Sequence, residues 1–231
     1  MKNICVAIAI LFFAGCASTQ TETQPNTLSR AEQRQGWTLL FDGTSTTGWR
    51  GDGKQSFPEK GWRVEDGTLH KIARERGGDI ITEKMYSEFD FRWDWKLAPR
   101  GNNGVKYFVT PERKGVGHEY QMIDGDKGVH STASFYEVLP PWTNMQTALK
   151  PPGEWNSSRI LAKGNKVEHW LNGQKVLEYE LGSDEVKAGI AKSKFKNVPH
   201  FGERVRGHIL LTDHGDECTF RNLKILDLSK D

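Results

Sequence analysis

The chain has 231 residues, a length that suits one domain with a sizeable core. Its 32 lysines and arginines nearly balance its 30 aspartates and glutamates, and the formal net charge is +2. Such a balance excludes recruitment of nucleic acid or of an anionic membrane by overall charge alone.

The first 15 residues have the layout of a secretory signal, because Lys2 precedes an apolar run over residues 4–13 that is too short to span a bilayer. Two small residues then lead to Cys16, as in a bacterial lipobox. The sequence therefore predicts a lipoprotein signal peptide over residues 1–15 and lipidation of Cys16. A plain signal peptide with an incidental cysteine is the alternative. Alanine after Cys16 resembles an outer-membrane sorting signal, so we expect an exported protein, lipid-anchored at the periplasmic side or the surface of that membrane.

Residues 16–35 are polar and cannot bury enough apolar surface to fold alone, so we expect a tether with one short helix near residues 29–35. The domain then spans residues 36–231. Of the three cysteines, the first leaves with the signal and the second takes the lipid. We therefore expect no internal disulfide, and we expect Cys218 to be a small buried residue of the last strand.

From residue 37 onward, short apolar or alternating runs are separated by glycine, asparagine, aspartate and proline, and helical periodicity is almost absent. This pattern indicates an all-β domain, either a sandwich or a barrel. Tight hairpins are expected at residues 65–67 and at 171–174, whose Asn-Gly pair suits a type I′ turn. The expected strands cover residues 37–41, 62–65, 68–71, 80–82, 87–97, 105–110, 119–123, 159–163, 166–171, 175–180, 207–212 and 219–226.

The longest expected strand, residues 87–97, alternates apolar and charged side chains, so one of its faces is apolar and the other is charged. In a two-sheet sandwich the apolar face lies inward. The charged face carries Asp90, Arg92 and Asp94. This face is then either a polar substrate groove or a solvated surface crossed by ion pairs.

The strand around Glu119 brings a carboxylate and an amide to one face, because Glu119 and Gln121 alternate with Tyr120 and Met122. The apolar pair belongs in the core. Glu119 and Gln121 are therefore expected to face a groove, where a carboxylate can act as a base. An ion pair between Glu119 and Arg92 on a neighbouring strand is the alternative.

A glycine-bracketed turn at residues 101–104 is expected to lead into a strand that carries Lys106 and Tyr107. Only one of these two side chains can face a groove. Burial of a lysine is costly, so Lys106 is the better candidate, and its ammonium group could stabilise a developing oxyanion.

The acidic loop at residues 213–217 could hold a hard cation such as calcium, although a turn between two strands needs no metal. No His-x-His, HExxH, phosphate-binding or dinucleotide-binding motif is present, and no Ser-His-Asp order can be defended. The sequence therefore implies no cofactor with certainty, and a divalent metal stays an open alternative.

Several motifs in order along the chain carry a family resemblance. They are Leu39-Leu40-Phe41-Asp42-Gly43 with Gly48-Trp49, Gly104-Val105-Lys106-Tyr107, Glu119-Tyr120-Gln121, Glu154-Trp155-Asn156, Glu168-His169-Trp170-Leu171-Asn172-Gly173, Ser193-Lys194-Phe195, and Asp213-His214-Gly215 with Phe220-Arg221-Asn222. Over residues 37–226 the chain resembles the 3-keto-disaccharide hydrolase domain family. The resemblance implies a concanavalin-like jelly-roll sandwich of two antiparallel sheets.

The same resemblance implies an enzyme that cleaves glycosides already oxidised to 3-keto sugars, as a 3-keto-glucoside 1,2-lyase or a hydratase of the resulting 3-keto-2-hydroxyglucal. A ketone at carbon 3 acidifies the proton on carbon 2, a base removes that proton, and the enolate expels the group on carbon 1. Addition of water completes net hydrolysis. The implied partner is a carbohydrate and the implied setting is carbohydrate catabolism outside the cytoplasm.

Such a reaction needs a base, an enolate stabiliser and an acid for the departing oxygen. Motif position and groove parity make Glu119 the candidate base, Lys106 the candidate enolate stabiliser, and His130 or His118 the candidate acid. His169 could equally be a histidine of the core. The side chains expected to contact the sugar are Gln121, Asp124, Arg92, Asn103, Tyr107, Trp142, His169 and His214.

Two other functions stay open. The same sandwich hosts non-catalytic, lectin-like carbohydrate-binding modules, which need an aromatic platform such as Trp142 but no base. A glycosidase of the two-carboxylate kind would need paired acids across the bond, and Asp90 and Asp94 lie in no glycosidase signature.

Overall fold

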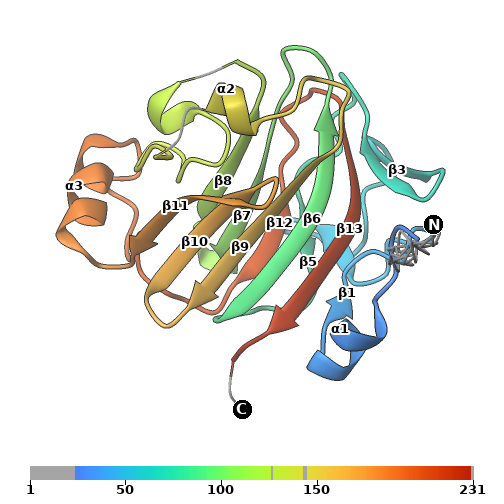
Figure 1. The fold of residues 1–231 in the computed structure, drawn as a ribbon, viewed down its shortest axis with the longest axis horizontal. Coiled ribbons are helices and arrows are strands. Elements are labelled where there is room, and N and C mark those ends of the chain that lie inside the picture. Colours follow the sequence, from blue (N-terminus) through green and yellow to red (C-terminus); the bar gives the residue numbers. More distant parts are fainter. Residues whose placement is uncertain (1–23, 126, 143–144, 230–231) are drawn as a thin grey trace, which may run out of the picture.

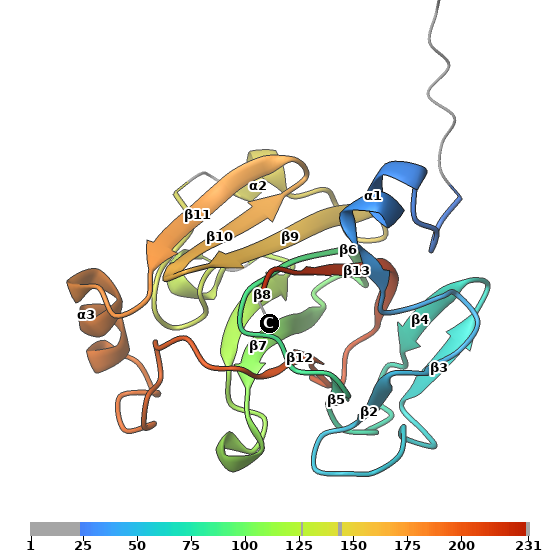
Figure 2. The same cartoon turned by 90° about the horizontal axis from the view of Figure 1, so that it is seen from below.

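The computed structural model describes residues 24–125, 127–142 and 145–229, and it confirms the predicted all-β fold, a jelly-roll sandwich of two antiparallel sheets (Figure 1). Figure 2 shows the two sheets edge-on, stacked face to face. The larger sheet has the strand order β11-β10-β9-β6-β13-β4-β3, and β1 also pairs with β13. The smaller sheet has the order β2-β5-β12-β7-β8.

Strands β6, β7, β9 and β13 have eight to ten residues each, and the other strands have two to seven. The larger sheet consists of β1 (Thr38–Leu39), β3 (Trp62–Glu65), β4 (Thr68–Lys71), β6 (Phe89–Leu97), β9 (Asn156–Lys163), β10 (Lys166–Leu171), β11 (Gln174–Glu180) and β13 (Cys218–Asp227). The smaller sheet consists of β2 (Trp49–Gly51), β5 (Ile80–Thr82), β7 (Asn102–Val109), β8 (His118–Ile123) and β12 (His208–Leu211). The α-helices of the described ranges are α1 (Arg30–Gln35), α2 (Met145–Ala148) and α3 (Asp184–Lys192), and none is long and apolar enough to cross a membrane.

The core lies between the two sheets and is built on the apolar face of β6. Phe89, Phe91, Trp93 and Trp95 are all fully buried there. Trp93 meets Tyr120 of the opposite sheet edge to face, with ring centroids 5.0 Å apart. Burial of each such side chain contributes about 1.5–3 kcal/mol. The alternation in the sequence therefore fixes which face of β6 lies inward.

The charged face of β6 is an ion-pair surface and not a substrate groove. Arg159 holds Asp90 with two hydrogen bonds of 2.7 and 2.8 Å, and Arg92 donates to the same carboxylate at 2.9 Å. The Arg92 guanidinium also lies over the Trp37 ring, 4.4 Å from its centroid. The structure gives no support to the expected contact of Arg92 with a sugar, because the Arg92 side chain is paired on the outer face of the larger sheet.

The segment at residues 24–35 is docked on β13 and is not a free tether. The N–H of Asn26 donates to the side chain of Asn222 at 2.6 Å, and the side chain of Asn26 accepts the N–H of Asn222 at 2.8 Å. The short helix is present as predicted, and Ser29 and Glu32 form a capping box at its start. The ordered domain therefore begins before residue 36. The predicted signal peptide and Cys16 lie outside the described residues.

Both predicted hairpins are confirmed, and each has two consecutive residues with positive φ. Asn172 and Gly173 have φ values of 48° and 80°, as a type I′ turn between β10 and β11 requires. Cys218 is buried in β13, as predicted.

The start of β7 and the helix α3 also differ from the expectation. Residues 102–104 of the expected turn at 101–104 already belong to β7, because Asn102 pairs with Ile123 at the end of β8. Helix α3 was not expected, since Val186 is its one buried residue and it lacks the apolar stripe that marks a helix in sequence. Its start is fixed by Ser183, whose hydroxyl accepts the N–H of Val186 at 3.3 Å.

Candidate active site

A cavity of about 230 Å³ lies against β7 and β8, on the face of the smaller sheet that points away from the core. Its position follows from strand parity, because the intervening residues Val105, Tyr120 and Met122 are fully buried between the sheets. Loops before and after β8, after α3 and between β12 and β13 complete the wall. The lining residues are Asn102, Lys106, Val116, Gly117, Glu119, Gln121, Tyr136, Lys194, Phe195 and His214.

Glu119 is the carboxylate of this cavity. Its side chain is 5% exposed, and its Oε1 atom has no hydrogen-bond partner among the described residues. The Nε2 atom of the His214 imidazole lies 3.6 Å from Oε1. A buried acceptor without a partner is costly, so this carboxylate oxygen beside the cavity is a candidate contact for a bound ligand.

Glu119 reaches this position because the neighbouring strand has a glycine there. A Cβ atom added to Gly104 would collide with Oε1 of Glu119. The carboxylate therefore lies across β7 toward the loop of His214. The expected alternative, an ion pair of Glu119 with Arg92, is wrong, because the two residues belong to different sheets.

Lys106 pairs with Glu119 across β7 and β8 and brings an ammonium group to the same cavity. Its Nζ atom donates to the carbonyl oxygen of Gly115 at 3.2 Å and lies 3.9 Å from a carboxylate oxygen of Asp79. Beside it, Gln121 donates to the side-chain oxygen of Asn102 at 3.0 Å. The strand pair thus presents a carboxylate, an ammonium group and two amides to one space.

The loop that carries His214 is held by a buried ion pair. Lys71 lies 3.0 Å from Asp213, and both side chains are almost fully buried. Burial alone would raise the pKa of Asp213, but hydrogen bonds from Lys71 and from the N–H groups of Gly78 and Gly77 outweigh it and hold that pKa below its usual value. Asp213 is therefore structural, while the next residue reaches the cavity.

The carboxylates of the acidic loop at residues 213–217 are not arranged as ligands of a cation. Asp213 is engaged by Lys71, and Asp216 accepts the N–H of Asn102 at 3.0 Å. Within the described ranges, no three side chains of histidine, cysteine, aspartate or glutamate gather as metal ligands would. The calcium hypothesis for residues 213–217 therefore gains no support from the geometry.

Two of the histidines proposed for the site lie in the core. His118 is fully buried and accepts the N–H of Gly202 at 3.0 Å, and burial lowers its pKa to about 3. His169 is also fully buried, between the hydroxyl of Tyr107 and the carbonyl of Ala133, each at 2.9 Å. Burial lowers the pKa of His169 to about 4. His118 as an acid and His169 as a sugar contact are therefore wrong, and the reading of His169 as a core histidine is right.

Tyr107 and Asn103, two further candidates for sugar contact, lie on the buried face of β7 and not on the face that borders the cavity. Tyr107 is fully buried in the core, where its hydroxyl bonds to His169 and to Tyr179. Asn103 is buried as well, and its amide donates to the carbonyl of Thr212 at 2.9 Å. Its neighbour Asn102 has the side chain that lines the cavity.

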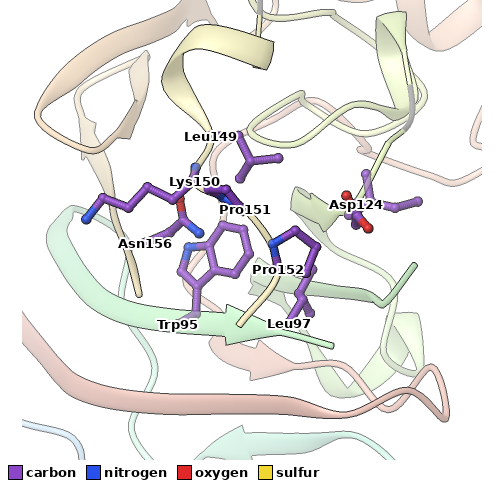
Figure 3. Close-up of a pocket in the computed structure, with 9 residues that line it drawn as sticks. Trp95, Leu97, Asp124, Leu149, Lys150, Pro151, Pro152 and Asn156 are labelled. Carbon is purple, nitrogen blue, oxygen red and sulfur yellow. The ribbon is translucent and has the colours of Figure 1, made fainter. Parts of the chain in front are cut away.

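The remaining candidates lie away from the cavity lining. Asp124 accepts the N–H of Arg100 at 2.8 Å and borders a hollow of about 10 Å³ beside Trp95 and Pro152 (Figure 3). That hollow has room for about one water molecule and not for a sugar. The Trp142 side chain is 62% exposed, and the backbone N–H of Trp142 donates to the carbonyl of Val176 on the larger sheet.

His130 lies beside Glu137 and Tyr136. Its Nε2 atom is 3.2 Å from Glu137, and its ring centroid is 5.4 Å from that of Tyr136. It is not among the lining residues. Of the residues proposed from sequence, Glu119, Lys106, Gln121 and His214 are the ones that the structure brings together. Sequence reasoning missed Tyr136 and Lys194, although Lys194 belongs to one of the family motifs.

A jelly-roll sandwich that places a carboxylate, an ammonium group and an imidazole around one cavity has the features of a glycoside-cleaving enzyme. The chain belongs to the family of the 3-keto-alpha-glucoside-1,2-lyase-like domain, whose model matches residues 36–226. It is 30% identical to a Bacteroides thetaiotaomicron protein named 3-keto-disaccharide hydrolase, over 82% of this chain and 78% of that protein.

Two solved structures from Parabacteroides distasonis, both described as candidate glycosyl hydrolases, are also similar. One has a TM-score of 0.80 and 36% identity, and the match covers 89% of this chain and all of that one. The other has a TM-score of 0.66 and 25% identity, with 83% of this chain and 99% of that chain covered.

Proposed function

We propose that this protein cleaves glycosides oxidised to 3-keto sugars, by elimination across carbons 1 and 2 followed by hydration, in the cavity on β7 and β8. The observation that carries the proposal is the carboxylate of Glu119, which faces the cavity with one oxygen unpartnered among the described residues. Membership of the lyase-like family and the name of the Bacteroides relative support the choice of substrate.

Glu119 is the base in this proposal. Its carboxylate takes the proton from carbon 2, which the neighbouring ketone has made acidic, and the electron pair of the broken C–H bond moves into the enolate. Lys106 is the cationic neighbour of Glu119 across the strand pair, so its ammonium group stabilises the charge that develops on the ketone oxygen. The enolate then expels the oxygen substituent on carbon 1.

The remaining polar groups bind and orient the sugar. Gln121 and Asn102 are neutral amides that are hydrogen-bonded to each other. Each has further donors and acceptors that can bind sugar hydroxyls. His214 lies beside the unpartnered oxygen of Glu119 and fixes the side from which the carboxylate approaches the substrate. Water addition to carbon 1 and return of a proton to carbon 2 complete net hydrolysis.

A chromogenic assay tests the proposal. The purified domain is incubated with a 3-keto-glucoside that carries a p-nitrophenyl leaving group and, separately, with the unoxidised glucoside. We expect release from the keto compound alone, and we expect Glu119→Gln to lower its rate by about 100-fold or more, because that change removes the base. Release from the unoxidised glucoside at a similar rate would contradict the proposal.

The matched control is Asp124→Asn, which also turns an acid into its amide. Asp124 borders the small hollow and not the cavity, so this variant is expected to keep the wild-type rate. Tight binding of the keto sugar without release by the wild-type protein would instead indicate a lectin-like module.

We further propose that the protein is exported and held by lipid at Cys16, on the periplasmic side or the surface of the outer membrane, where it acts on sugars outside the cytoplasm. The signal layout of residues 1–15 supports this proposal. Cys16→Ser should move the protein from the membrane fraction to the soluble fraction of fractionated cells. Equal amounts of both forms in the membrane fraction would contradict it.

A further inference from the structure

The proposed reaction leaves one role without a residue, and this inference rests on that proposed function. A group must give a proton to the oxygen that departs from carbon 1. His118 is buried in the core, and His130 pairs with Glu137 outside the cavity lining. The cavity wall beside Glu119 offers a different pair, Tyr136 and Lys194.

Tyr136 is fixed to the strand that carries the base. Its backbone N–H donates to the carbonyl oxygen of Glu119 at 3.0 Å, so the segment of Tyr136 extends the smaller sheet along the edge of β8. The side chain of Tyr136 lines the same cavity as the carboxylate. Carbons 1 and 2 of a sugar are bonded neighbours. A group attached to the backbone next to Glu119 is therefore well placed to meet the departing oxygen.

Lys194 contacts both the hydroxyl group and the ring of Tyr136. The Nζ atom donates to the Tyr136 hydroxyl oxygen at 3.3 Å and lies 4.4 Å from the centroid of the Tyr136 ring. The same Nζ atom is 3.8 Å from a carboxylate oxygen of Glu137, which keeps the lysine on this side of the cavity. An ammonium group has only donors. The phenol proton of Tyr136 is therefore left to donate to a third group.

We propose that Tyr136 is the general acid of the elimination and that Lys194 is its positioning residue. The C–H bond at carbon 2 breaks and its proton goes to Glu119. The bond between carbon 1 and the glycosidic oxygen breaks, the electron pair goes to the oxygen, and the Tyr136 hydroxyl gives that oxygen its proton. The phenolate that remains is stabilised by the ammonium group of Lys194.

The hydration step restores both groups. The Tyr136 phenolate takes a proton from a water molecule as the water oxygen bonds to carbon 1. Glu119 returns its proton to carbon 2, and the enolate regains the ketone. Tyr136 regains from water the proton that it gave to the departing oxygen, and Glu119 gives back the proton that it took from carbon 2, so the cycle needs no reactant other than water.

The test uses two 3-keto-glucosides that differ only in the leaving group, p-nitrophenol and methanol. A good leaving group departs without an acid, whereas methanol needs a proton. We expect Tyr136→Phe to lower kcat/KM for the methyl glycoside by about 100-fold or more and for the p-nitrophenyl glycoside by less than about 5-fold. Lys194→Met should show the same preference, and the two changes combined should cost little more than Tyr136→Phe alone.

Tyr86→Phe is the control, because Lys84 lies over the Tyr86 ring, 5.3 Å from its centroid, as Lys194 lies over Tyr136. Tyr86 does not line the cavity, so this variant should slow both substrates equally or not at all. If Tyr136→Phe lowered kcat/KM by the same factor for both leaving groups, or lowered neither, the assignment of Tyr136 would be overturned. The proposed function would then still stand. A wild-type protein that releases neither leaving group would overturn the proposed function together with this assignment.

Discussion

The carboxylate of Glu119 has room beside β7 only because the neighbouring residue there is Gly104. A Cβ at this position would collide with the Oε1 atom that faces the cavity. Gly104 does not have a positive φ, so its backbone suits an alanine. The one atom that alanine adds therefore acts on Glu119 and on little else.

Gly104→Ala is expected to displace the carboxylate and to lower kcat for the 3-keto-glucoside by about 100-fold, because a misplacement of about 1 Å has an effect of that size. Steady-state kinetics of the purified variant gives the value.

The control for this variant is Gly51→Ala, a strand glycine of the same sheet whose added Cβ would meet the flexible side chain of Lys54. It should leave kcat unchanged. A Gly104→Ala enzyme with wild-type kcat would show that the position of the carboxylate does not limit the reaction.

For single residues, the sequence could predict which strand side chains face the cavity, because side chains alternate between the two faces of a strand. Alternation with Tyr120 and Met122 placed Glu119 and Gln121 on the outer face, and the structure agrees. The same rule, applied strictly to β7, would have selected Asn102 instead of Asn103. Tyr136 and Lys194 come from loops, where no periodicity relates residue number to direction, so their place could not be predicted.

Among the elements, the loop between β12 and β13 depends on the ion pair of Lys71 and Asp213. Lys71 also donates to the carbonyl oxygens of Ile72 and Glu75, each at 2.6 Å. The pair thus ties the end of β4 to the loop that presents His214. A buried pair of this kind is costly to break from one side, because the remaining charge has no partner.

Lys71→Met is expected to lower the free energy of unfolding by about 3–5 kcal/mol, since it leaves Asp213 buried and unpaired. Urea denaturation of the purified variant measures the change.

The comparison for Lys71→Met is Lys84→Met, which breaks a pair with Asp227 whose lysine is 59% exposed. That change should cost about 0–1 kcal/mol. Equal losses in the two variants would mean that the buried pair does not hold the loop.

Short elements were predicted where a local signal existed. Strands β3, β4, β5 and β10 have the predicted limits, because turn residues or a change of alternation mark both ends. Strand β2 was not predicted, because its three residues include no β-branched side chain, whereas β5, of equal length, consists of β-branched residues. The docking of the segment at residues 24–35 depends on Asn26 meeting Asn222, a contact between residues far apart in the chain that local patterns do not reveal.

For the whole molecule, two buried histidines link stability to pH. Burial lowers the pKa of His118 to about 3 and that of His169 to about 4, whereas an unfolded imidazole titrates near 6.5. Between about pH 6.5 and 4 the unfolded chain therefore binds protons that the native protein does not. The contribution of the two histidines to the free energy of unfolding has its full value above about pH 6.5 and falls as the pH is lowered.

We expect the free energy of unfolding to fall by about 1.4 kcal/mol per pH unit for each of the two histidines over this range. Denaturant titrations at several pH values measure the slope. His118→Gln removes one titrating ring, so it should reduce the slope by about 1.4 kcal/mol per pH unit. A stability that is independent of pH between 6.5 and 4.5 would contradict the placement of both rings in the core.

The two-sheet architecture was predictable because the alternation of β6 demands an apolar layer on one side only. The assignment of strands to sheets was not. Glu119 and Arg92 both lie on outward faces, yet of different sheets, so the groove and the ion-pair surface are separate. Only long-range pairing distinguishes these two surfaces, and short-range patterns carry no information on it.

The most direct test of the central claim is the isotope effect at carbon 2. A methyl 3-keto-glucoside with deuterium on carbon 2 is compared with the unlabelled compound, for the wild-type protein and for Glu119→Gln. If Glu119 takes that proton, the wild-type rate should fall with deuterium, and Glu119→Gln should lose its activity and its exchange of deuterium with solvent. Wild-type cleavage without an isotope effect, together with undiminished exchange by Glu119→Gln, would contradict the account.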